Sequence, residues 1–128
     1  MYQNLSDPEA IGKVISYIEE LLDEAGVPLK TANRVNLAAD EIITNIVSYS
    51  GGTGAEITCE IRPEKILLIF EDDGMMYDPL QAREPDIKAS AEERQIGGLG
   101  IFLTRKMMSR ISYQRTGDKN RLQLELDR

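Results

Sequence analysis

Residues 66–79 read ILLIFEDDGMMYDP, an unbroken apolar run that ends abruptly in an acidic turn. An apolar run from Ile66 to Phe70 is typical of a central strand that is covered on much of both faces. Asp72 then stands where the strand leaves the sheet, and a carboxylate there can accept a hydrogen bond from an exocyclic amine. Gly74, two residues on, lets backbone approach a flat base. Because Asp-Gly is also common turn chemistry, the stretch alone leaves a plain acidic turn equally open.

Strand patterns recur on both sides of this run. The alternating apolar residues before it are Ile57, Cys59 and Ile61. They predict a strand with one buried face, and Pro63-Glu64 marks the turn between the two strands. Further along, residues 111–115 and 122–126 predict a closing hairpin around residues 117–120.

Two helices are expected before the first clear strand. Ser6-Asp7-Pro8-Glu9 offers a capping side chain, a proline suited to the first turn and a glutamate placed to close a capping box. The apolar face of this helix is Ile11, Val14, Ile15, Ile18, Leu21, Leu22 and Ala25, and Gly26 with Pro28 ends it. The second helix spans about Thr31 to Tyr49. Its apolar arc is Val35, Ala38, Ala39, Ile42, Ile43, Ile46 and Val47.

The segment from Pro79 to Ile96 is polar and aperiodic, and it is too long for an ordinary connection in so small a domain. We interpret it as a mobile lid at about residues 79–97. Gly97-Gly98-Leu99-Gly100 follows the lid, and residues 101–108 read as a helix. Together these elements predict an α+β fold, a two-layer α/β sandwich with helices packed on one face of a mixed, mostly antiparallel sheet.

The composition limits the function. With 128 residues, 41% hydrophobic and 29% charged, the chain reads as one domain over residues 1–128. The formal net charge of −7 repels phosphate backbones and anionic lipid heads, so we expect neither a nucleic-acid nor a membrane partner. The single cysteine, with no signal peptide and no membrane-spanning run in the sequence, predicts a cytoplasmic protein. The sequence contains no histidine, so carboxylates must do any acid–base work.

Two further segments complete a candidate site with Asp72 and Gly74. Glu41 and Asn45 are four residues apart, at the margin of the second helix's apolar arc, although this spacing alone favours an ordinary polar edge with a satisfied amide. Residues 97–100 open a helix and expose converging N–H groups to a phosphate chain, with a flexible hinge as the alternative. The order of the three segments along the chain favours one shared site.

These segments give the chain a resemblance to the GHKL superfamily of ATPases, and within it to the small serine kinases that act as anti-sigma factors in bacterial partner-switching systems. Glu41 and Asn45 match the N box, residues 72–79 match the D-x-G-x-x-[FY]-D-P form of the first glycine box, and residues 93–101 resemble the second. Residues 117–122 resemble that subgroup's last hairpin. The resemblance implies the Bergerat fold. The stretch before Ser6 is too short for the family's usual first strand.

The resemblance also implies a role for each matching residue. Asn45 would ligate Mg²⁺ through its side-chain oxygen while the metal bridges the phosphates of ATP, and Glu41 would act as general base. Asp72 would accept a hydrogen bond from the adenine amine, with Gly74 beneath the base. Met76, where the broad superfamily often has a second glycine, belongs to the same nucleotide pocket. The residues expected to lie against the phosphates are Gly97, Gly98, Leu99 and Gly100.

The leading hypothesis is a Mg-ATP-dependent serine-protein kinase that phosphorylates a STAS-domain anti-anti-sigma protein and alternately sequesters a sigma factor or similar regulator. A homodimer is implied by the resemblance only. The alternative is a module in which ATP sets lid conformation and partner affinity without phosphate transfer, and a third reading is a scaffold that no longer binds nucleotide. Arg94, Arg105 and Lys106 could reach the γ-phosphate or a partner, with solvated charges equally open.

Overall fold

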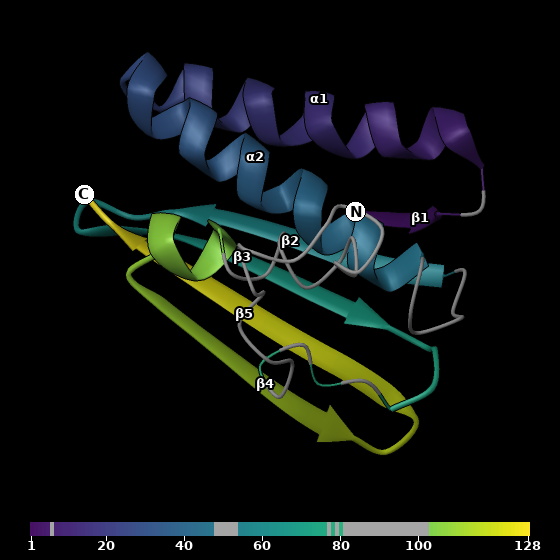
Figure 1. Ribbon diagram of the computed structural model, residues 1–128. Coiled ribbons are helices and arrows are strands. Elements are labelled where there is room, and N and C mark those ends of the chain that lie inside the picture. Colours follow the sequence, from purple (N-terminus) through teal and green to yellow (C-terminus); the bar gives the residue numbers. More distant parts are fainter. Residues whose placement is uncertain (6, 48–53, 77, 79, 81–102) are drawn as a thin grey trace, which may run out of the picture.

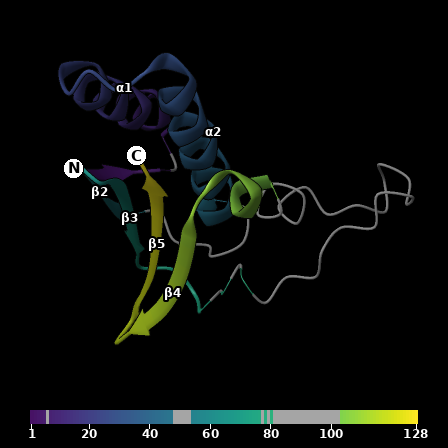
Figure 2. The same ribbon diagram turned by 90° about the vertical axis from the view of Figure 1, so that its left-hand side faces the viewer.

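The computed structural model describes residues 1–5, 7–47, 54–76, 78, 80 and 103–128. Within these residues a layer of two helices covers one face of a five-stranded sheet (Figures 1 and 2). The helices are α1 (Pro8–Glu24) and α2 (Leu29–Asn45), and the strands are β1 (Tyr2–Asn4), β2 (Gly54–Ile61), β3 (Lys65–Asp72), β4 (Arg110–Thr116) and β5 (Lys119–Asp127). The strand order is β1-β2-β3-β5-β4, and each of the four pairings is antiparallel. The α+β sandwich expected from the sequence is confirmed.

Helix α1 begins and ends with the chemistry that its sequence offers. Its N-cap is Asp7, whose carboxylate accepts a hydrogen bond from the Glu9 N–H at 3.0 Å, and Pro8 occupies the first turn. Asp7 thus supplies the capping side chain that the sequence predicts at this helix start, and the proline lies in the first turn as expected. Gly26, with φ of 70°, adopts the left-handed conformation that ends the helix.

Helix α2 begins at Leu29 and ends at Asn45, where the sequence predicted a span from Thr31 to Tyr49. Tyr49 lies outside the described residues. The predicted apolar arc is buried from Val35 to Ile46, but Val47 is 45% exposed and does not belong to the core. The helix therefore brings Asn45, its last residue, to the end of the buried face.

The first strand corrects an expectation from the sequence. The stretch before Ser6 is long enough for a strand, because β1 pairs along the edge of β2 from Tyr2 opposite Glu56 to Asn4 opposite Gly54. The ladder extends by one residue beyond β1, since the Met1 ammonium donates to the Ile57 carbonyl at 2.7 Å and the Ile57 N–H donates to the Met1 carbonyl at 2.8 Å. A three-residue strand carries too little periodicity for sequence patterns to predict it.

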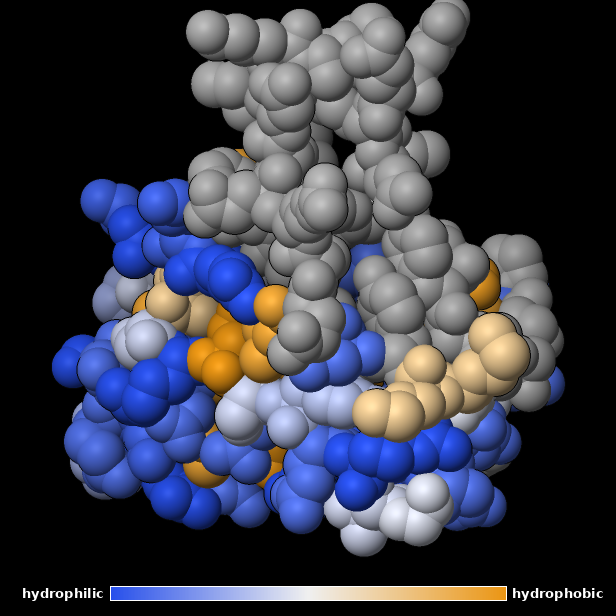
Figure 3. Space-filling model, turned by 60° about the horizontal axis from the view of Figure 1, so that its bottom comes forward, coloured by the Kyte–Doolittle hydropathy of each residue, from blue (hydrophilic) through white to orange (hydrophobic). Residues whose placement is uncertain are grey.

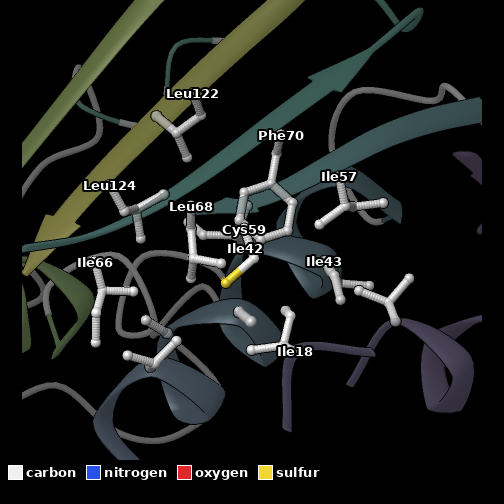
Figure 4. Packing of buried hydrophobic residues seen from close by; sticks show 14 of the residues in the cluster. Ile18, Ile42, Ile43, Ile57, Cys59, Ile66, Leu68, Phe70, Leu122 and Leu124 are labelled. Carbon is white, nitrogen blue, oxygen red and sulfur yellow. The ribbon is translucent and has the colours of Figure 1, made fainter. Parts of the chain in front are cut away.

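The core lies between the helix layer and the inner face of the sheet. Figure 4 shows β3 and β5 side chains facing residues of both helices, and the labelled members of this cluster are Ile18, Ile42, Ile43, Ile57, Cys59, Ile66, Leu68, Phe70, Leu122 and Leu124. On the other face of β3, Leu67 is only 5% exposed and Ile69 is half-buried, which agrees with the prediction that this strand is covered on much of both faces. Burial raises the pKa of the Cys59 thiol to about 11, so the side chain stays a neutral part of the core.

The outer face of the sheet is polar. Arg110 on β4 forms ion pairs with Glu125 and Asp127 on β5, and its hydrogen bonds lower the pKa of both carboxyl groups. Arg121 pairs with Glu71 at 2.6 Å. Figure 3, seen from below the view of Figure 1, is mainly hydrophilic with small separate hydrophobic areas. The apolar surface of the sheet is thus directed toward the helices.

Candidate nucleotide-binding site

The described candidate residues gather at one end of the helix–sheet interface. Figure 1 shows the C-terminal end of α2 at the same end of the molecule as the C-terminal end of β3 and the β4–β5 turn. Asp72 closes β3 on the inner side of the sheet, two residues after Phe70, and its neighbours across the ladder are Ala55 and Asn120. Asn45 ends α2. The fold therefore brings together residues that are far apart in the chain.

Asp72 is a buried carboxylate with an ordered environment. The side chain is 5% exposed, and its Oδ1 accepts two hydrogen bonds, one from the Gly74 N–H at 2.9 Å and one from Asn120 Nδ2 at 3.1 Å. Among the described residues, Oδ2 accepts none. A carboxylate oxygen with no donor at the edge of a buried site can accept from a ligand amine.

The turn after Asp72 is held by the β4–β5 hairpin. Asn120 is 4% exposed, and its Nδ2 also donates to the Met75 carbonyl at 2.7 Å. Its Oδ1 accepts a hydrogen bond from the Tyr113 hydroxyl at 2.5 Å. Arg115 Nη1 donates to the Gly74 carbonyl at 2.8 Å. Both the side chain of Asp72 and the backbone that follows it are thus fixed by neighbouring strands.

Asn45 is buried like Asp72 and Asn120, but its side chain differs from theirs in its hydrogen bonding. The residue is 3% exposed, yet neither Oδ1 nor Nδ2 has a hydrogen-bond partner in the part of the chain that the structure describes. An unsatisfied buried polar group typically costs about 1–3 kcal/mol, which the fold tolerates when a ligand satisfies it. Amide oxygens are hard ligands of the kind that Mg²⁺ accepts. The orphaned amide therefore fits the role of a metal ligand.

Glu41 lies one helical turn before Asn45 and is half-buried. Burial raises the pKa of its carboxyl group, and the negative charge of the adjacent Asp40 raises it further. A carboxylate with a raised pKa is a stronger proton acceptor once it is ionised. Glu41 is therefore better suited to act as a general base than a fully solvated surface glutamate would be.

The remaining predicted site residues divide into two groups. Met76 is a described residue. Its side chain is 70% exposed to solvent, and so is that of Met75. The predicted phosphate-binding residues 97–100 and almost all of the predicted lid lie outside the described residues. Leu80, a described residue within the predicted lid range, accepts a hydrogen bond at its carbonyl from Arg105 Nη2 at 2.7 Å.

Sequence reasoning missed the residues of the hairpin that contact the site. Asn120 carried a signal that could have been used, because it occupies an inward position of a strand whose next inward residues are leucines, at positions 122, 124 and 126. A polar side chain in such a series requires buried partners. Tyr113 and Arg115 lie on the neighbouring strand, and only the register of β4 with β5 places them near the turn.

The two-layer sandwich carries Asp72, Asn45 and Glu41 at the end where α2 and β3 finish. The sequence profile of the histidine kinase-like ATPase domain matches residues 5–126. The chain belongs to this family.

Named relatives agree with this assignment. The chain is 38% identical over 94 residues to the serine/threonine-protein kinase BtrW of Bordetella bronchiseptica, which covers 70% of this chain and 66% of BtrW. It is 30% identical over 110 residues to the serine-protein kinase RsbW of Listeria monocytogenes, which covers 79% of this chain and 69% of RsbW. The chain thus spans about two thirds of the length of these relatives. Their names support the kinase activity predicted from the motifs.

Solved structures support the fold. The catalytic domain of the histidine kinase ThkA aligns over 99% of this chain and 95% of its own length, with a TM-score of 0.56 at 16% identity. The histidine kinase AdeS of Acinetobacter baumannii aligns over 99% of this chain and 67% of its own, with a TM-score of 0.52 at 17% identity. The GHKL-type fold expected from the sequence is confirmed.

No helix among the described residues has the length and apolar character needed to cross a membrane.

Proposed function

We propose that this protein is a Mg-ATP-dependent serine-protein kinase that phosphorylates a STAS-domain antagonist and alternately sequesters a sigma factor or similar regulator. The observation that carries the proposal is the orphaned Asn45 amide beside Glu41, at the same end of the fold as the prepared Asp72 turn. The kinase names of two relatives support the activity. The partners are proposed from the motif resemblance.

The chain's own residues would divide the reaction between them. Asp72 Oδ2 accepts from the exocyclic amine of adenine, and the ordered backbone at Gly74 lies against the base. Bound Mg²⁺ would neutralise charge on the phosphates, and Asn45 Oδ1 is the side-chain oxygen that would hold it. Glu41 takes the proton from the incoming serine hydroxyl. Phosphoryl transfer depends mainly on such positioning and charge neutralisation.

Replacement of the proposed base separates the kinase from a module that only responds to nucleotide. Glu41→Gln should lower the rate of phosphate transfer by roughly 100-fold or more while ATP affinity changes little, because the isosteric amide cannot accept the proton. Transfer from radiolabelled Mg-ATP to the STAS-domain proteins encoded in the same genome measures the rate. Glu24→Gln, at the exposed end of α1, is the matched control.

The outcome that overturns the kinase proposal is specific. If the wild-type protein binds Mg-ATP but transfers no phosphate to any of these proteins, the nucleotide-gated binding module becomes the better description. That module predicts that Glu41→Gln alters partner affinity little.

A further inference from the structure

We propose that Asn120 is a positioning residue that gives the site its preference for a purine with a 6-amino group. The proposal rests on the proposed function, because it assumes that a nucleotide base binds at Asp72. We infer no contact between Asn120 and the base. It acts by fixing the orientation of the Asp72 carboxylate, which leaves one oxygen without a donor among the described residues.

The two oxygens of the Asp72 carboxylate differ in their hydrogen bonds. Oδ1 accepts from the Gly74 N–H and from Asn120 Nδ2, at 2.9 and 3.1 Å, whereas Oδ2 accepts from no described residue. Because the two hydrogen bonds hold one oxygen in place, they fix the orientation of the carboxylate plane, and rotation away from it would break both. Oδ2 is therefore the oxygen held toward the ligand.

The orientation of the Asn120 amide follows from its hydrogen bonds. An asparagine side chain could present either its oxygen or its nitrogen to Asp72. The Tyr113 hydroxyl donates to Asn120 Oδ1 at 2.5 Å, and this bond directs the two N–H groups to Asp72 Oδ1 and to the Met75 carbonyl. Tyr113 thus selects the amide orientation, and the amide in turn fixes the carboxylate.

The described donors to Asp72 are neutral. Arg115 and Arg121 both lie on the strands of the hairpin, but Arg115 donates to the Gly74 carbonyl and Arg121 pairs with Glu71. Asp72 instead receives a backbone N–H and an amide N–H. A carboxylate held in this way only accepts hydrogen bonds, so it favours a donor at the 6-position and disfavours a carbonyl oxygen there.

ATP and inosine triphosphate form the matched pair of probes, since the 6-amino group of one is a 6-oxo group in the other. The wild-type protein should bind ATP more tightly than inosine triphosphate, measured by titration calorimetry in the presence of Mg²⁺. In Asn120→Ala, ATP affinity should fall by about 10-fold while inosine triphosphate affinity changes by less than about 3-fold, because the lost interaction is a hydrogen bond to a charged group. The preference for ATP should therefore fall several-fold.

Two further variants make the test robust. Tyr113→Phe removes only the hydroxyl that orients the amide, and it should reduce the preference by roughly 3-fold even if Asn120→Ala does not fold. Gln123→Ala is the matched control: its amide lies on the same strand but donates to Glu125 on the outer face. It should leave the preference unchanged.

The outcomes separate this inference from the function on which it rests. If the wild-type protein binds neither nucleotide, the proposed function fails and the inference falls with it. If it binds both equally, or if Asn120→Ala and Tyr113→Phe weaken both nucleotides in parallel, Asn120 is only a structural residue. The proposed function survives in that case and the inference does not.

Discussion

The molecule contains two buried asparagines at the same end of the sheet, and their environments are opposite. Asn120, 4% exposed, has its amide engaged with Asp72, Met75 and Tyr113. Asn45, 3% exposed, has no partner for either amide atom in the described part of the chain. In the half of the site proposed for the base, the asparagine amide is thus satisfied without a ligand, whereas in the half proposed for metal and phosphates it has no described partner. We therefore expect binding at the first half to need little reorganisation and the second half to gain stability from its ligand.

Of the variants that compare the two asparagines, Asn45→Ala should have the stronger effect, and it tests whether Asn45 is kept unsatisfied for a metal. Asn45→Ala should weaken Mg-ATP binding by at least about 10-fold, because even the outer partners of metal ligands contribute roughly 10–100-fold. Affinity for ATP measured in EDTA should change little. At a ligand concentration about 100 times the dissociation constant, Mg-ATP should stabilise the wild-type protein by about 2.7 kcal/mol, and the variant much less at the same concentration.

The control for this variant is Asn33→Ala, which replaces an exposed asparagine of the same helix. Equal loss of affinity with and without Mg²⁺ would show that Asn45 supports the shape of the pocket and does not bind a metal. Absence of any thermal shift in the wild-type protein would favour the scaffold that binds no nucleotide.

A smaller effect compares the two asparagines directly in the protein without ligand. Asn120→Ala should lower the free energy of unfolding by about 1–3 kcal/mol, since it leaves the hydrogen-bonding groups of Asp72, Met75 and Tyr113 without their partner. Asn45→Ala should cause no loss, because the amide that it removes makes no hydrogen bond. Urea denaturation measures both values.

Each of these two variants is compared with a control substitution on the same helix or strand. Asn33→Ala reports the helix propensity gained on α2, and Gln123→Ala reports the loss of an amide from β5. Similar losses for Asn45→Ala and Asn120→Ala, after these references are subtracted, would mean that the two halves of the site do not differ in the way described.

The same contrast explains how much the sequence could predict. Glu41, Asn45, Asp72 and Gly74 belong to local patterns, since helical spacing or strand-to-turn order places each of them on α2 or at the end of β3. Their chemical roles remain predictions. Local periodicity likewise predicted both helices and the order of β2, β3 and the closing hairpin.

The missed features depend on pairings between distant parts of the chain. Asn120 meets Asp72 only because β5 pairs with β3 in one particular register, and no local pattern encodes that register. The three-residue strand β1 is defined by its partner β2 and has no period of its own. Val47 matched the helical pattern, but it lies beyond the end of α2 and is exposed.

The smallest effect concerns the charge next to the proposed base. Two causes raise the pKa of Glu41, burial first and the Asp40 carboxylate second, and Asp40→Asn removes only the second. The pKa of Glu41 should then fall but stay above its ordinary value of 4.5. Because a general base must be deprotonated, the acid limb of the pH–rate profile should move to lower pH. On that limb the variant should be faster than the wild type by no more than about 5-fold, since exposed charges typically interact by less than about 1 kcal/mol. A profile that stays in place, or moves to higher pH, would mean that the rate follows the ionisation of another group, and the role of Glu41 as base would then have to be abandoned.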